Sequence, residues 1–147
     1  MELTGRQRAF LAPARSLLRL DRSVERVIDE ALRVHHDLGL REMFVLSTLE
    51  RAPLRPSQIA SDLNLPAPSI TRLSERLVGR GLVERRPGRH DRRHVDLELT
   101  DDGRTLLGRA RADLAQALAD AWPDVDTARA SDLAEGLGEL SARVERP

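Results

Sequence analysis

The chain has 147 residues, 40% hydrophobic and 33% charged, with no cysteine and a formal net charge of zero at pH 7. This length suits a single domain, and the apolar fraction excludes a disordered chain. Without cysteine there can be no disulfide, thiolate metal site or thiol-based redox sensor. Phe10, Phe44 and Trp122 are the only aromatic residues, so a recognition surface of stacked rings is not expected.

No apolar run approaches the roughly 18 residues that a membrane span needs. The residues from Met1 to Arg6 do not resemble the start of a signal peptide. We therefore expect a cytoplasmic protein without a membrane partner.

The zero net charge hides a division along the chain. Residues 51–94 hold 10 arginines and 4 acidic residues, a net charge of +6, whereas residues 95–147 have a net charge of −6. All 24 basic residues are arginine, whose planar guanidinium suits phosphate and guanine. Codon preference in a GC-rich genome is the simpler explanation for the absence of lysine. The basic middle predicts a surface that contacts a polyanion.

Apolar residues at helical spacing predict a long amphipathic helix from about Pro13 to His36, ended by Gly39. The residues before it, with Phe10 and Leu11, form a short arm or an extra helix. So long an apolar stripe exceeds the needs of one small core, so part of it is expected to pack against a second chain.

Three shorter helices are predicted next, over about Arg41–Glu50, Pro56–Leu63 and Ala67–Arg80. Pro56 suits the first turn of its helix, and Gly81 suits the position just after the last of the three. Asn64, Leu65 and Pro66 form the tight turn between the second and third.

After Gly81 the spacing of the apolar residues changes from helical to alternating. Leu82–Arg86 and His94–Leu99 are predicted to be two short strands joined by the polar, arginine-bearing loop 87–93, which makes a β-hairpin with a basic tip. Thr100 is a suitable N-cap for a helix that runs to about Trp122, and a last helix covers Thr127–Val144.

The order of these elements predicts a mostly α fold with a small β-hairpin wing, a winged helix-turn-helix of about six helices in one domain, 1–147. The second helix of the pair can enter the major groove of duplex DNA. Arginines at the hairpin tip suit the narrow minor groove, where the negative potential is focused.

Four stretches in this order resemble the MarR family of transcriptional regulators. They are Leu40-Arg41-Glu42-Met43-Phe44-Val45-Leu46; Pro56-Ser57-Gln58-Ile59-Ala60-Ser61-Asp62-Leu63; Ile70-Thr71-Arg72-Leu73-Ser74-Glu75-Arg76-Leu77 with Arg80-Gly81-Leu82-Val83-Glu84-Arg85; and Asp91-Arg92-Arg93 followed by Leu99-Thr100-Asp101-Asp102-Gly103.

The resemblance implies an obligate homodimer that binds double-stranded DNA. Residues 1–39 and 101–147 would supply the dimerisation helices, and residues 40–100 the DNA-binding lobe. It further implies a pseudo-palindromic operator and, usually, repression relieved by a small aromatic or anionic effector. No cofactor is implied.

By position, Ser69, Thr71, Arg72 and Arg76 match the DNA-facing side of the family's recognition helix. Asp91 and Arg93 match the wing's Asp-x-Arg, in which the aspartate orients an arginine that enters the minor groove. The full set of expected DNA-binding residues is Arg55, Ser57, Pro68, Ser69, Thr71, Arg72, Arg76, Arg86, Asp91, Arg92 and Arg93.

Two departures from the family pattern concern this surface. Pro66-Ala67-Pro68 stands where the family often has a Ser N-cap followed by Arg and Ser, so the recognition helix offers fewer polar groups at its start. This can shift specificity toward Arg72, the wing and DNA shape. Arg55 stands where a Ser or Thr N-cap is more usual, and we expect it to contact phosphate.

Simpler explanations exist for several of these residues. Arg72 and Arg76 can be the solvated face of a helix, and Asp91 can be only a turn former. A ligand pocket at the junction of the first two helices would involve His35, His36, Met43 and Phe44, although structural or solvated histidines explain the pair as well. No metal site is expected, because adjacent histidines on a helix point about 100° apart.

No motif of an enzyme occurs: no serine stands in a nucleophile motif, and no glycine loop of the phosphate-binding kind is present. The alternative to a DNA-binding regulator is a winged-helix module that binds a protein partner and does not read DNA, which the Ala67-Pro68 pair keeps open.

Overall fold

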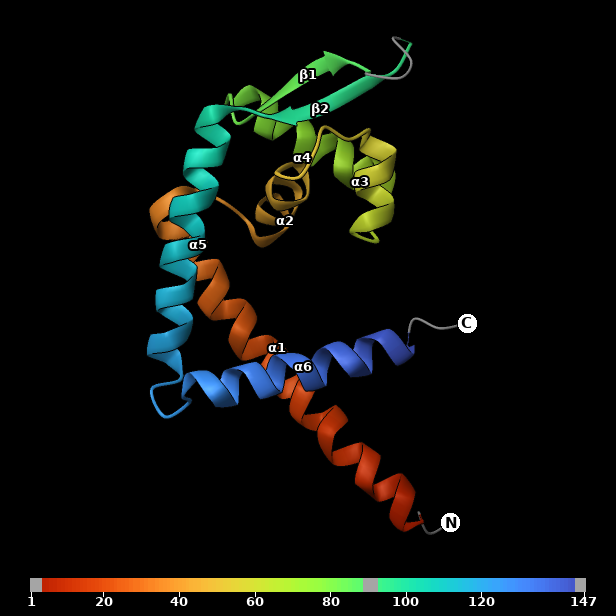
Figure 1. Cartoon of the computed structure of the whole chain (residues 1–147), viewed down its shortest axis with the longest axis vertical. Helices are drawn as coiled ribbons and strands as arrows, with labels where there is room; N and C mark the ends of the chain where they lie inside the picture. The colour runs from red at the N-terminus through yellow and green to blue at the C-terminus, as the bar shows by residue number, and fades with distance from the viewer. Residues whose placement is uncertain (1–3, 89–92, 145–147) are drawn as a thin grey trace.

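The computed structural model describes residues 4–88 and 93–144 of the chain. This part contains six α-helices and one antiparallel hairpin, in the expected order (Figure 1). Their bounds are α1 Gly5–His36, α2 Leu40–Leu49, α3 Pro56–Asp62, α4 Ala67–Gly79, β1 Val83–Pro87, β2 Val95–Leu99, α5 Asp101–Ala121 and α6 Thr127–Val144.

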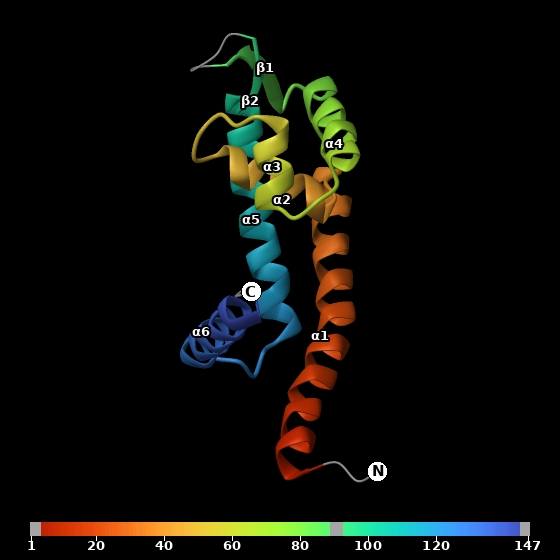
Figure 2. The ribbon, with the colours of Figure 1, turned by 90° about the vertical axis from the view of Figure 1, so that its right-hand side faces the viewer.

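The molecule has a winged lobe at one end and a helical stalk at the other. α2, α3, α4, β1 and β2 form the lobe, while α1 and α5 pack along each other below it (Figures 1 and 2). The core lies where the lobe meets the stalk. Its fully buried large side chains are Leu32, Leu38, Val45, Leu46, Leu49, Ile59, Ile70, Leu77, Val83, Leu97, Leu99 and Leu107.

The first helix begins earlier than predicted, whereas its last residue, His36, is the predicted one. α1 begins at Gly5 and is continuous through Pro13, so residues 5–12 are neither a separate arm nor an extra helix. The exposed ring of Pro13 costs this long helix one backbone hydrogen bond without ending it. Asp37, at φ +49°, ends α1 two residues before Gly39, and the Leu38 N–H donates back to the Leu32 carbonyl at 3.2 Å.

The other helix ends follow the sequence closely. Gly81, at φ +71°, ends α4, where the Leu82 N–H donates to the Leu77 carbonyl at 3.0 Å. Thr100 caps α5 as predicted, because its Oγ1 accepts from the Gly103 N–H at 3.0 Å. α6 has the bounds that the sequence predicts.

The hairpin pairs β1 with β2 in antiparallel register, from Val83 opposite Leu99 to Pro87 opposite Val95. Both strands begin one residue later than predicted, and β1 includes Pro87. Leu54 adds a single bridge to Leu97, which ties the segment before α3 to the wing. Within the described residues no helix is long and apolar enough to cross a membrane.

Candidate nucleic-acid interface

The helix-turn-helix consists of α3 and α4. A short turn joins them, in which Asn64 takes a left-handed conformation at φ +49° and Pro66 occupies the N-cap of α4. Ile59 from α3 and Ile70 from α4 are both fully buried in the core, where the two helices pack against each other. The opposite side of α4 is therefore held away from the core.

α4 carries five of the eleven residues predicted to bind DNA. Pro68, Thr71, Arg72 and Arg76 are exposed, whereas Ser69 is half-buried. Arg72 forms no ion pair or hydrogen bond with any residue in the described ranges, so its guanidinium is free to bind a ligand. The Thr71 hydroxyl donates to the Ala67 carbonyl at 3.1 Å.

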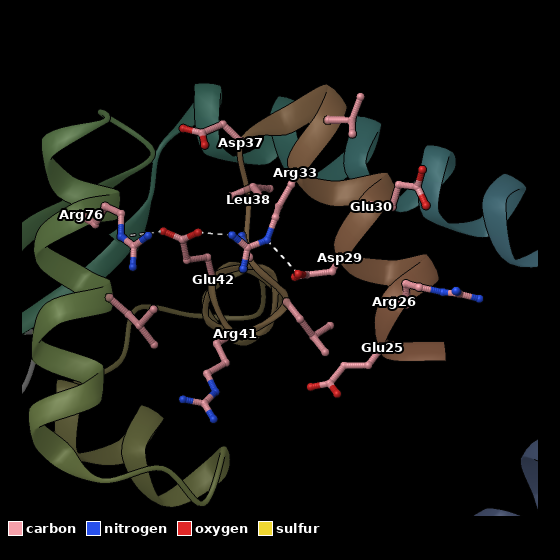
Figure 3. A pocket seen from close by; sticks show the side chains of 14 residues that line it. Glu25, Arg26, Asp29, Glu30, Arg33, Asp37, Leu38, Arg41, Glu42 and Arg76 are labelled. Atoms are coloured by element: carbon pink, nitrogen blue, oxygen red, sulfur yellow. Dashed lines mark hydrogen bonds and ion pairs between the residues drawn. The ribbon is translucent and has the colours of Figure 1, made fainter. Parts of the chain in front are cut away.

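Arg76 differs from Arg72 because it has a buried partner. Its Nε lies 3.2 Å from Oε1 of Glu42, a side chain of α2 that is only 3% exposed, while 63% of the Arg76 side chain remains exposed (Figure 3). The other Glu42 oxygen accepts from the Gly39 N–H at 2.8 Å. Glu42 thus joins the start of α2 to α4, a role that was not predicted from the sequence.

At the start of α3, Arg55 is the N-cap residue and is half-buried. Its backbone N–H donates to Oε1 of Gln58 at 3.0 Å. Ser57, in the first turn, is exposed. These two predicted contacts lie on a different helix from the exposed face of α4.

The arginines of the wing differ in their surroundings. The guanidinium of Arg86 lies 2.6 Å from Glu84 and 3.8 Å from Glu98, so acidic neighbours on the same hairpin largely balance its charge. Arg93 is exposed. The predicted contacts Asp91 and Arg92 lie outside the described residues. Arg85, which was not among the predicted contacts, is exposed on β1.

The residues predicted to line a ligand pocket do not meet in one cavity. His36 is turned toward α5, where its Nε2 lies 2.8 Å from Asp113 Oδ2. His35 is exposed, Met43 lies in the core, and Phe44 lines a cleft between α2, α3 and α5.

A larger cleft does lie at the junction of α1 and α2, where the pocket was expected. It has a volume of about 970 Å³ and is bounded by α1, α2 and α4 (Figure 3). Its walls are strongly charged, and its arginines are Arg26, Arg33, Arg41 and Arg76. No group of histidine and acidic side chains suited to a metal ion occurs among the described residues.

Comparison with known proteins identifies the family. The sequence profile described as the MarR family matches residues 36–94. The regulator PecS of Dickeya dadantii is 35% identical over 100 residues, which are 65% of this chain and 57% of PecS. The transcriptional repressor MprA of Escherichia coli K12 is 26% identical over 104 residues, 71% of this chain and 59% of MprA. The chain thus spans less than two thirds of either relative, and both are named as transcriptional regulators and not as enzymes.

The fold has close counterparts among solved structures. The crystal structure of the regulator BldR from Sulfolobus solfataricus superimposes with a TM-score of 0.83, covering 96% of this chain and 99% of BldR at 23% sequence identity. That similarity establishes the winged helix-turn-helix fold with its flanking long helices. The fold, the profile match and the regulator relatives agree, and the chain belongs to the MarR family.

Proposed function

We propose that this protein is a homodimeric, DNA-binding transcriptional regulator that reads a pseudo-palindromic operator. The exposed, unpaired Arg72 on α4, within a lobe whose segment 51–94 has a net charge of +6, carries this proposal. Each α4 enters a major groove, and the wing arginines Arg92 and Arg93 reach the adjacent minor groove. The name of MprA, a repressor, supports repression as the mode of action.

The proposed dimer forms through the stalk. Every described side chain of α6 is exposed in the single chain, and Leu133, Leu137 and Leu140 form an apolar stripe at helical spacing. An exposed apolar stripe of this kind is unfavourable in water, and a second copy of the chain that packs on it would bury it. α1 adds exposed apolar residues, among them Leu20 and Val34.

A small anionic effector is proposed to relieve repression from the cleft between α1, α2 and α4. The volume of this cleft, about 970 Å³, suits a small molecule. Arg41 and Arg76 line it from two elements of the DNA-binding lobe. A carboxylate bound there competes with Glu42 for Arg76, and this competition links the cleft to the recognition helix.

The test is selection of the purified protein on a random duplex library, followed by affinity measurements on the enriched duplex at several salt concentrations. We expect an inverted repeat and a logarithmic salt slope of about −0.9 per phosphate neutralised. Arg72→Ala should relax specificity at one base position per half-site, at a cost of about 1–3 kcal/mol.

The matched control is Arg109→Ala, which removes an exposed arginine from α5, outside the winged lobe. It should leave specificity unchanged. Failure to enrich any duplex, with weak and sequence-blind binding, would favour a winged-helix module that binds a protein partner.

A further inference from the structure

The first turn of α4 offers few backbone donors to a phosphate. The N–H groups of Ser69 and Ile70 both donate to the Pro66 carbonyl, at 2.9 and 3.3 Å. Pro68 has no N–H, so Ala67 carries the one N–H of this turn without a partner in the described part of the chain. Helix N-termini bind anions through such free N–H groups, and this helix is poorly equipped to do so.

The same turn instead exposes apolar groups. Ala67 and Pro68 are exposed, and Thr71 follows them at the spacing that places side chains on one face. Because the Thr71 hydroxyl donates to the Ala67 carbonyl at 3.1 Å, its methyl group is the part of the side chain left for an outside contact. A methyl group, a pyrrolidine ring and a second methyl group thus adjoin at the start of the helix.

The side chains on the exposed face that can form hydrogen bonds with bases lie further along α4 than this apolar patch. Arg72 and Glu75 are exposed and have no partner in the described ranges, whereas Nε of Arg76 is engaged by Glu42. In the major groove, arginine reads guanine and a carboxylate accepts from the amino group of cytosine. Thymine is distinguished there by its 5-methyl group, which apolar side chains contact.

Resting on the function proposed above, we propose that the start of α4 recognises thymine by its 5-methyl group, through the ring of Pro68 and the methyl group of Thr71. The two prolines that remove polar donors from this helix thereby create an apolar contact of a size suited to that methyl group. Arg72 and Glu75 read the neighbouring base pairs.

The experiment replaces each thymine of the selected operator in turn by deoxyuridine, which removes one methyl group and keeps the base pairing and phosphates. At one or two positions per half-site we expect affinity to fall about fourfold per methyl group. Thr71→Ser removes the matching methyl group from the protein and keeps the hydroxyl. It should cause a similar loss on the thymine operator and little further loss on the uracil operator.

The matched control is Thr48→Ser on α2. Thr48 makes the same kind of bond, from its hydroxyl to the Phe44 carbonyl at 2.9 Å, and it lies on another helix. This variant should show the full loss on replacement of thymine by uracil.

Three results would overturn the inference. Equal affinity for thymine and uracil at every position would refute the methyl contact and leave the proposed DNA binding intact. A uracil penalty that persists undiminished in both Thr71→Ser and Pro68→Ala would assign the methyl contact to another part of the protein. Failure of the protein to prefer any sequence would refute the proposed function and this inference together.

Discussion

At the scale of single residues, Glu42 joins two parts of the lobe. Its carboxylate accepts from the Gly39 N–H at the start of α2 and lies 3.2 Å from Arg76 of α4. Oε1 of Glu42 accepts no hydrogen bond from the described residues, so its attraction to Arg76 is that of an ion pair. A carboxylate this deeply buried is stable because both of its oxygens face positive partners.

Replacing Glu42 tests this account. Glu42→Ala should lower the free energy of unfolding by about 1–3 kcal/mol, because it leaves the Gly39 N–H without an acceptor. Glu42→Gln should cost less, since its amide oxygen still accepts that bond. Urea denaturation measures both, and the exposed Glu75→Ala on α4 is the control, expected within about 0.5 kcal/mol of the parent. A Glu42→Ala protein as stable as the control would contradict the bridging role.

At the scale of elements, the start of α5 is packed against the end of the helix-turn-helix. A Cβ added at Gly103 would lie against the carbonyl oxygen of Leu82 and 2.8 Å from Cδ1 of Leu99. Gly108, further along the same helix, has no atom within 4 Å of an added Cβ. The two glycines therefore give opposite expectations for one substitution.

Gly103→Ala should destabilise the protein by about 3 kcal/mol, because backbone must move to admit the methyl group. Gly108→Ala should stabilise it by about 0.5–1 kcal/mol, the difference in helix propensity. Thermal unfolding followed by circular dichroism measures both. Equal shifts in melting temperature would refute the close approach of α5 to Leu82.

The sequence predicted the order of all eight elements, because hydrophobic periodicity and turn residues are local signals. It placed the start of α1 eight residues late, since Pro13 reads as a first-turn residue. In the structure Pro13 lies on an exposed surface, where the loss of one hydrogen bond is tolerated within a 32-residue helix. Asp37 ended the helix in place of the predicted Gly39, because an aspartate can also adopt the left-handed conformation.

The residues of the candidate interface were predictable where position in the helix decides exposure, as for Arg72. They were not predictable where a distant element decides it. Glu42 reads as a polar residue in the first turn of a helix, and its burial depends on the packing of α4 across α2. Its position three residues after Gly39 is a local signal for the hydrogen bond from the Gly39 N–H. No local signal indicates its partner on α4.

At the scale of the whole molecule, the division of charge along the chain follows the fold only in part. The segment with net charge +6 lies in the winged lobe, and the segment 95–147, with net charge −6, forms β2, α5 and α6. α6 lies in the half of the molecule remote from the hairpin (Figures 1 and 2). The excess of arginine in residues 51–94 attracts a polyanion to the lobe.

Leu137→Asp on α6 tests whether the stalk forms the proposed dimer. Leu137 is 41% exposed in the single chain, and burying a carboxylate in its place should weaken dimerisation by about 2 kcal/mol or more. Sedimentation velocity over a range of concentrations measures the change. Ser131→Asp, on the opposite side of α6, is the control and should leave the association constant unchanged. A parent protein that stays monomeric would contradict the dimer itself.

Arg80, the C-cap residue of α4, has a consequence for operator length. Its guanidinium donates to the carbonyl oxygens of Asp37 at 2.6 Å and His36 at 3.0 Å, where α1 ends. The C-terminal end of each α4 is therefore hydrogen-bonded to the end of α1. In the proposed dimer, the stalks hold the two recognition helices at a set separation. One extra base pair between the half-sites displaces one of them by about 3.4 Å and turns it by roughly 35° around the duplex axis. A protein fastened in this way tolerates little variation in the spacer between its half-sites.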